Sequence, residues 1–197
     1  LLAYQEEPDA PEALSCIPLL EREDIEKKAK PFVNEEKQVE GCKVLHHKVY
    51  TNGINYIRLA FEVGDLAEYA SYIGLLSELI GGMDTDEHDK LELSNEILLH
   101  AGGYSVNTDT YKNRKTDKDG ITFELTAKVL QSETGYVLNL LREIMTSTHL
   151  EDEKRLREII GEVRSLRQSS MLSAGHSTAV WRGLSYINDQ YYHMEQM

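Results

Sequence analysis

Few side chains in this sequence stand at spacings that could support chemistry. His46 and His47 have the side chain of a metal ligand, but neighbours on a strand point to opposite faces, so we expect no shared ion. The acidic run 84–89 lacks the glycine and the closing glutamate of a calcium-binding loop. Gly81–Gly82 and Gly102–Gly103 match no phosphate-binding pattern, and we interpret both pairs as helix ends. These residues indicate no catalytic constellation.

The remaining candidate residues are two cysteines and two histidines. Cys16 and Cys42 show neither metal-ligand spacing nor a disulfide framework, which favours a reducing compartment, with a disulfide between the two thiols as the alternative. His176, in the segment 175–177, interrupts what would otherwise be one long helix, and it could cap that helix or contact a partner. An independent enzyme with a metal site built from His100, His176 and acidic neighbours is an alternative that metal analysis would test.

Composition excludes several classes of protein. The 197 residues include 34 Asp and Glu against 21 Lys and Arg, a net charge of −13, which disfavours nucleic acid and anionic membranes as partners. No apolar run approaches the ~20 residues that span a bilayer, and the first residues lack the basic and apolar segments expected of a signal peptide. A hydrophobic content of 41% is enough for a core. Because the chain does not begin with Met, we expect a fragment of a longer protein.

The first forty residues differ from the rest of the chain. They contain all four prolines, and the charged, helix-permissive segment 21–30 is stopped by Pro31. We expect residues 1–40 to form a linker or hinge arm, with a disordered terminus as the alternative. Residues 41–197 are expected to form one folded domain.

Apolar periodicity predicts two pairs of antiparallel strands. Strands 43–50 and 54–63 flank an Asn-Gly turn at 51–53 and should form a hairpin, and strands 104–111 and 120–129 form the second pair. Apolar residues three and four apart predict helices at 65–80, 89–100, 137–145, 156–166 and 179–192.

Two details complete the expected fold. Asp65 with Glu68, and Asp89 with Glu92, stand in capping-box spacing at the starts of the first two helices. The order β-β-α-α-β-β-α-α-α predicts an α+β fold in which helices pack on one face of an antiparallel sheet.

Several segments together resemble the core repeat of insulinase-type (pitrilysin-like) zinc metallopeptidases. These segments are 72–85, 93–97 and 100–106, and in the active half of that family the corresponding helix carries H-x-x-E-H. Further segments resemble the presequence protease branch, and the resemblance covers nearly the whole chain. They are 17–20 with 24–25, 51–56, 74–76, 94–97, 173–177 and 184–186.

The zinc motif itself is degenerate in this chain. On the family pattern, Leu75 and Leu79 replace the two histidines, and leucine has no atom that can bind Zn²⁺. Glu78 stands where the general base would be, without a metal-bound water to activate. A third acidic ligand, at Glu153 or Glu158, would have no partners. The resemblance therefore implies no catalytic residue and no metal ligand here, and its substrate-binding residues stay unknown.

The resemblance also implies a role. Members of the family are clamshells of two halves, with the zinc site in the first half. This chain resembles the end of the linker plus the first domain of the non-catalytic second half, which would form part of the wall of a chamber that admits unfolded peptides. The implied partners are the catalytic half of the same polypeptide, which would hold the zinc, and the peptide substrate.

Three expectations follow from that role. The acidic charge could favour basic peptides such as targeting presequences. The isolated fragment could form a homodimer through an exposed apolar patch. The location would be the cytoplasm in a bacterium, and the mitochondrial matrix or a plastid in a eukaryote. A scaffold or assembly module of the same fold, without a peptidase partner in the same chain, is the alternative function.

Overall fold

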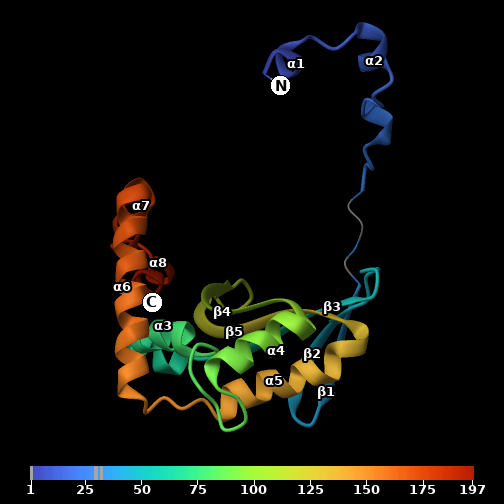
Figure 1. Cartoon of the computed structure of the whole chain (residues 1–197). Helices are drawn as coiled ribbons and strands as arrows, with labels where there is room; N and C mark the ends of the chain where they lie inside the picture. Colours follow the sequence, from blue (N-terminus) through green and yellow to red (C-terminus); the bar gives the residue numbers. More distant parts are fainter. Residues whose placement is uncertain (1, 29–30, 32) are drawn as a thin grey trace. The chain divides into compact units, whose positions relative to one another are not determined.

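The chain divides into two compact units. The computed structural model describes residues 2–28, 31 and 33–197, and the boundary between the units lies between Tyr50 and Thr51 (Figure 1). This boundary follows the predicted end of the arm at residue 40. The linker role of residues 1–40 stays a prediction.

The described residues of the first unit form short elements without a buried core. Its helices are α1 (Leu2–Glu6), α2 (Pro11–Ser15) and the 3-10 helix η1 (Arg22–Asp24), and they are followed by strands β1 (Asn34–Val39) and β2 (Cys42–His47). All residues of this unit whose burial is described are exposed. Within the helix-permissive segment 21–30, η1 is the helical part of the described residues, and residues 29 and 30 lie outside them.

The strand predicted at 43–50 pairs with a partner that the sequence pattern did not reveal. β2 is antiparallel to β1, and the two-residue turn between them, Glu40–Gly41, has φ angles of 49° and 85°. The predicted hairpin between 43–50 and 54–63 is therefore wrong. The Asn-Gly turn forms, since Asn52 and Gly53 both have positive φ, but the strand that follows it pairs elsewhere.

The reason for this error lies in the composition of β1. Five of its six residues are polar and the strand is exposed throughout, so no apolar alternation marks it. Backbone ladder bonds form the hairpin, and two side-chain contacts join its strands: Lys43 Nζ lies 3.1 Å from Glu36 Oε2, and His46 Nδ1 lies 3.4 Å from Glu35 Oε2 on the opposite strand.

The second unit is built on a three-stranded antiparallel sheet. Its order is β3 (Ile54–Glu62), β5 (Lys118–Leu130) and β4 (Ala101–Asn113), with Leu125 of the central strand opposite Leu59 and Val106. The second predicted strand pair is confirmed and extends further at both ends. Along β5 the odd-numbered residues from 121 to 129 are buried, whereas the residues between them face the other side of the sheet.

Helices α3 (Ala70–Leu79), α4 (Lys90–His100) and α5 (Thr134–Thr146) cover the odd-numbered face of β5. Figure 1 shows α4 and α5 lying along the sheet. Leu93 of α4, Leu141 and Ile144 of α5, and Leu125 of β5 are at most 1% exposed and form the centre of the core. The predicted α+β fold, a sheet with helices on one face, is confirmed.

Of the two capping boxes predicted from the sequence, one is present in the structure and the other is not. The capping box at α4 is confirmed: the Asp89 carboxylate accepts from the backbone N–H groups of Leu91 and Glu92, while Glu92 accepts from the N–H of Asp89. The one predicted at Asp65 and Glu68 is wrong, because that segment is the 3-10 helix η2 (Gly64–Tyr69), whose N-cap has no side-chain hydrogen bond.

The two glycine pairs behave differently. Gly81 follows α3 with a φ of 83°, a left-handed conformation that ends the helix as predicted. Gly102–Gly103 instead lies inside β4, at a bulge between Ala101 and Gly103, and α4 already ends at His100. The helix-end interpretation of the second pair is therefore wrong.

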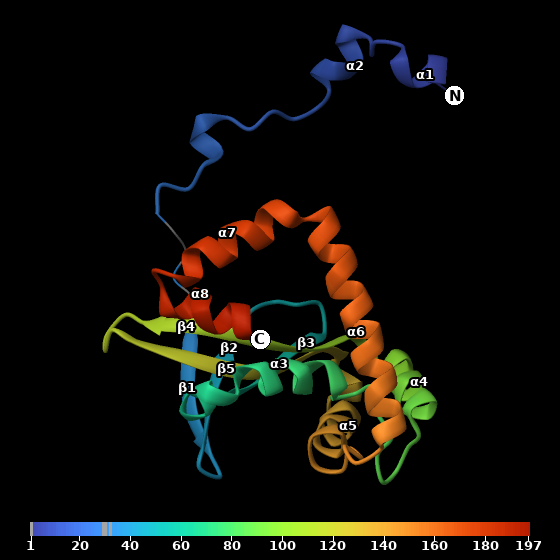
Figure 2. The same cartoon turned by 90° about the vertical axis from the view of Figure 1, so that its left-hand side faces the viewer.

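Three helices complete the chain after the 3-10 helix η3 (Gln131–Glu133) and α5. They are α6 (Glu153–Ser173), α7 (Gly175–Ser185) and α8 (Asp189–Gln196). The interruption predicted at 175–177 occurs at Ala174, whereas the single helix predicted at 179–192 is split between α7 and α8. Figure 2 shows α7 turning away from α6 and α8 returning towards α3. No helix in the described part of the chain is long and apolar enough to cross a membrane.

Candidate functional site

Helix α3 carries Leu75 and Leu79, the positions that the predicted resemblance assigns to the zinc motif, and both leucines pack against other apolar side chains. Leu79 is 6% exposed and lies in a small cluster with Met83 and with Ile159 of α6, while Leu75 packs at the margin of the same cluster. Residues four apart share one face of a helix. The face that would present two metal ligands therefore forms the seam between α3 and α6.

The neighbouring positions of α3 are also occupied by structural contacts. A Cβ atom at Gly74 would clash with the carbonyl oxygen of Met197, so only glycine fits where the backbone of Met197 lies against α3. Glu78 is exposed, and its Oε1 atom lies 3.4 Å from Nη2 of Arg167 on α6. Exposed ion pairs of this kind contribute little to stability.

The side chains on α3 do not fit zinc. Leucine has no lone pair for a metal, and Glu78 is paired with an arginine instead of a metal-bound water. Among the residues that the structure describes, no three His, Cys, Asp or Glu side chains are arranged to hold a metal ion. His100 and His176 therefore do not form the alternative metal site. His176 is exposed near the start of α7.

A buried carboxylate binds side chains of the acidic loop 84–89, which follows α3. Glu143 of α5 is 7% exposed, its Oε1 atom accepts a hydrogen bond from the Thr85 hydroxyl, and it lies 2.9 Å from Nδ1 of His88. The hydrogen bond to Glu143 raises the pKa of His88, against the opposing effect of burial, and the carboxylates of Glu96 and Glu92 act in the same direction.

A second histidine holds the same loop from the other side. His149 Nε2 lies 2.7 Å from Asp86 Oδ1, and the His149 backbone N–H donates to the carbonyl oxygen of Asp84. The hydrogen bond to Asp86 raises the pKa of His149. The Asp84 carboxylate accepts from the N–H of Lys90 at the start of α4. The acidic side chains thus fix a turn and a helix start.

His100 joins the end of α4 to the start of α5. Its Nδ1 atom lies 2.8 Å from Glu133 Oε2 and its Nε2 atom lies 3.4 Å from Glu96 Oε2. The ring packs against Tyr136 in a tilted arrangement with a centroid separation of 4.3 Å, and the Tyr136 hydroxyl donates to Glu96. These contacts connect two core helices, which is a structural role.

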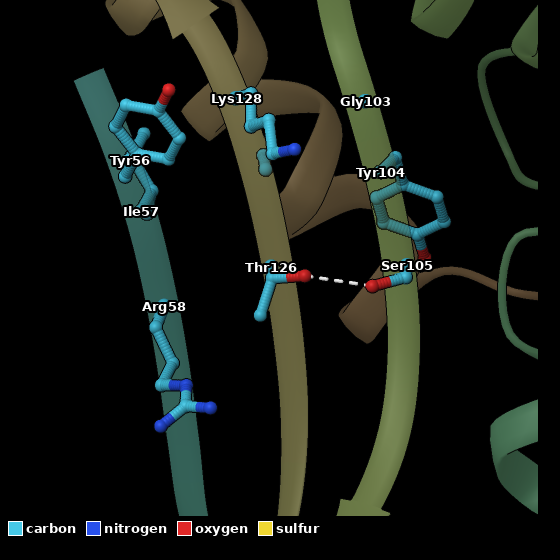
Figure 3. A pocket seen from close by; sticks show the side chains of 9 residues that line it. Tyr56, Ile57, Arg58, Gly103, Tyr104, Ser105, Thr126 and Lys128 are labelled. Atoms are coloured by element: carbon cyan, nitrogen blue, oxygen red, sulfur yellow. Dashed lines mark hydrogen bonds between the residues drawn. The ribbon is translucent and has the colours of Figure 1, made fainter. Parts of the chain in front are cut away.

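The face of the sheet away from the helices holds a pocket of about 350 Å³ (Figure 3). Its lining comes only from the three strands. Ser105 Oγ and Thr126 Oγ1 are 2.7 Å apart, Arg58 Nε lies 3.1 Å from Glu124 Oε2, and Lys128 Nζ lies 6.0 Å from the centre of the Tyr56 ring. These residues carry no motif or spacing in the sequence that marks them as a site. The sequence feature that could have indicated this polar face is the alternation in β5, where residues 122, 124, 126 and 128 are polar.

Comparison with known proteins identifies the class to which the chain belongs. A family model described as peptidase M16C associated matches residues 1–197, so the chain belongs to that family. It is 35% identical over 188 residues to Protein HypA of Clostridium perfringens, covering 94% of this chain and 19% of that protein.

Presequence proteases are also among the relatives. The chain is 28% identical over 194 residues to presequence protease 1, chloroplastic/mitochondrial, of Arabidopsis thaliana, covering 98% of this chain and 18% of that protein. The mitochondrial presequence protease of Saccharomyces cerevisiae is 26% identical over 205 residues, covering 100% of the chain and 20% of that protein. The predicted resemblance to this branch is confirmed. The chain spans about a fifth of the length of these relatives.

The packing role of α3 can be measured by substitution. We expect Leu79→Ala to lower the free energy of unfolding by about 2–5 kcal/mol, because it opens a cavity in the seam with α6. Glu78→Gln, one residue away, should change it by less than about 0.5 kcal/mol, because it breaks an exposed ion pair. Urea denaturation followed by circular dichroism measures both values. Equal, small effects would show that the seam does not hold α3.

The contact between His88 and Glu143 predicts a pH effect. Because the pKa of His88 is raised in the folded chain, protonated His88 stabilises the fold below its ordinary pKa of about 6.5, and this contribution is lost as pH rises through the raised value. In an NMR titration, Glu143→Gln should lower the midpoint of His88. His149, whose partner is Asp86, serves as the control and should keep its midpoint. An unchanged His88 midpoint in the variant would contradict this assignment.

Proposed function

We propose that this chain is a non-catalytic segment of a larger zinc-dependent peptidase that degrades unfolded peptides. One observation supports the proposal: in a chain of the M16C-associated family, Leu75 and Leu79, which the resemblance assigns to the zinc-binding positions, pack between α3 and α6. On this proposal the segment has the fold of a peptidase half, and α3, which would carry the metal in the active half, holds the domain together.

The zinc and the catalytic residues would lie in another part of the same polypeptide. The relatives support this arrangement, because each is about five times as long as the matched segment. The segment described here would form part of the chamber wall opposite the zinc site. By the names of the relatives, the location would be a bacterial cell or, in a eukaryote, mitochondria or plastids.

The charge of the chain supports a class of substrate. A net charge of −13 attracts basic peptides over a distance of about 10 Å at moderate salt. We therefore propose that the substrates include unfolded basic peptides, of which targeting presequences are one kind.

The inert role of α3 predicts the activity of a variant. In the full-length protein that contains this chain, Glu78→Gln should leave the rate of peptide cleavage within about twofold, because Glu78 binds an arginine and activates no water. The matched control replaces the glutamate of the H-x-x-E-H motif elsewhere in the protein by glutamine, which should reduce kcat at least about a hundredfold. Loss of cleavage in Glu78→Gln would make this segment catalytic and refute the proposal.

The proposed electrostatic attraction predicts that cleavage of a basic peptide depends on the salt concentration. In the full-length protein, kcat/KM for a basic peptide should fall as ionic strength rises, because added salt screens the attraction that speeds association. An acidic peptide of the same length should show no fall. Steady-state cleavage of both peptides over a range of sodium chloride concentrations measures this difference. Equal rates that do not depend on salt would exclude electrostatic selection.

A further inference from the structure

We propose that the sheet face away from the helices binds the C-terminal carboxylate of a peptide in the pocket around Lys128. The proposal rests on the proposed function only in taking a peptide as the ligand. The pocket is lined by β3, β5 and β4, and Figure 3 shows Tyr56, Lys128 and Ser105 on these three strands.

Lys128 supplies a positive charge that the fold does not neutralise. It stands on the central strand between Tyr56 of β3 and Gly103 of β4. In the part of the chain that the structure describes, Lys128 pairs with no carboxylate, and its ammonium group lies over the Tyr56 ring. Arg58 differs, because its Nε atom lies 3.1 Å from Glu124 Oε2 in an ion pair. The pocket therefore has one cation in excess.

The hydroxyl pair beside Lys128 adds a further donor. Ser105 Oγ accepts from the Asn107 side-chain amide at 3.0 Å and shares a hydrogen bond with Thr126. Each hydroxyl has one proton, and a single proton suffices for the bond between them. Whichever residue donates, the other keeps a proton for a ligand. A carboxylate, which only accepts hydrogen bonds, matches a site with surplus donors.

The pocket has room for a chain end. Gly103 stands opposite Lys128 without a side chain, and a Cβ atom there would lie 3.8 Å from the Lys128 Cδ atom. Tyr56 is 63% exposed and forms one wall, against which the apolar part of a terminal residue can pack.

Charge along the same face favours a basic peptide body. Glu62 of β3 and Asp109 of β4 both stand opposite Thr122, six residues from Lys128 along β5. Six residues of a strand span about 20 Å. A basic peptide could place its C-terminus at Lys128 and its cations towards these carboxylates. In a chain with a net charge of −13, peptides with many acidic side chains are repelled, which leaves the terminal carboxylate as the anion delivered to the pocket.

The test compares two forms of one fluorescent basic peptide that contains no Asp or Glu. One form ends in a free carboxylate and the other in an amide, and fluorescence anisotropy with residues 1–197 measures Kd at low salt. We expect the carboxylate form to bind about tenfold more tightly. Lys128→Met should reduce this ratio to about one, whereas Lys128→Arg should keep most of it.

Matched variants separate the pocket from general charge. Lys112→Met makes the same charge change on β4, where Lys112 pairs with Asp117, and should leave the ratio unchanged. Gly103→Leu should abolish the preference by filling the pocket, and circular dichroism verifies that each variant is folded. Equal binding of the two wild-type forms, absence of binding, or a ratio that survives Lys128→Met would overturn the proposal.

A third peptide identifies the source of the carboxylate. It ends in an amide and carries one internal glutamate. If it binds as tightly as the free-acid form, the site recognises side chains and the assignment to the chain end is wrong; we expect it to bind like the plain amide. Because this assay needs no cleavage, it distinguishes failure of the pocket from failure of the proposed function, which Glu78→Gln tests in the full-length protein.

Discussion

The second unit depends on the burial of every second residue of its central strand. Leu125 and Val129 of β5 are at most 1% exposed and lie among residues of α3, α4 and α5. Because side chains alternate along a strand, burying this set places Thr126 and Lys128 on the opposite face. The same constraint thus fixes the helices on one side of the sheet and leaves polar groups together on the other side.

The spacing that makes a zinc site also makes a helix seam. Positions 75 and 79 share one face of α3, and the protein fills that face with leucines that pack towards Met83 and Ile159. An imidazole at position 79 would bury a polar ring among apolar side chains, and burying it without a partner costs free energy. A catalytic metal, in contrast, needs an open coordination position that substrate can reach. The two uses of this face are incompatible, and the apolar packing holds α3 in place without any metal.

The sequence predicted elements whose local pattern matched their final environment. Strand 120–129 alternates because one face is buried, and the capping box at Asp89 is a purely local interaction. β1 was missed because exposed polar residues leave no period. Gly102–Gly103 was misinterpreted because a glycine pair after a helix fits both a cap and a bulged strand. The pocket was missed because its residues are brought together by strand register and not by spacing in the sequence.

Net charge and the pocket act on a peptide at different distances. The electrostatic attraction exerted by the acidic chain extends over about one Debye length, and its strength depends only on the net charge of the peptide. Lys128 and the hydroxyl pair would act at hydrogen-bond distance and recognise one chemical group, the terminal carboxylate. Attraction to the net charge alone does not determine in which of the two directions a bound peptide runs along the surface. A contact that accepts only the terminal carboxylate removes this freedom, because a peptide has one such end. Acidic charge and Lys128 would therefore be complementary parts of the proposed recognition surface.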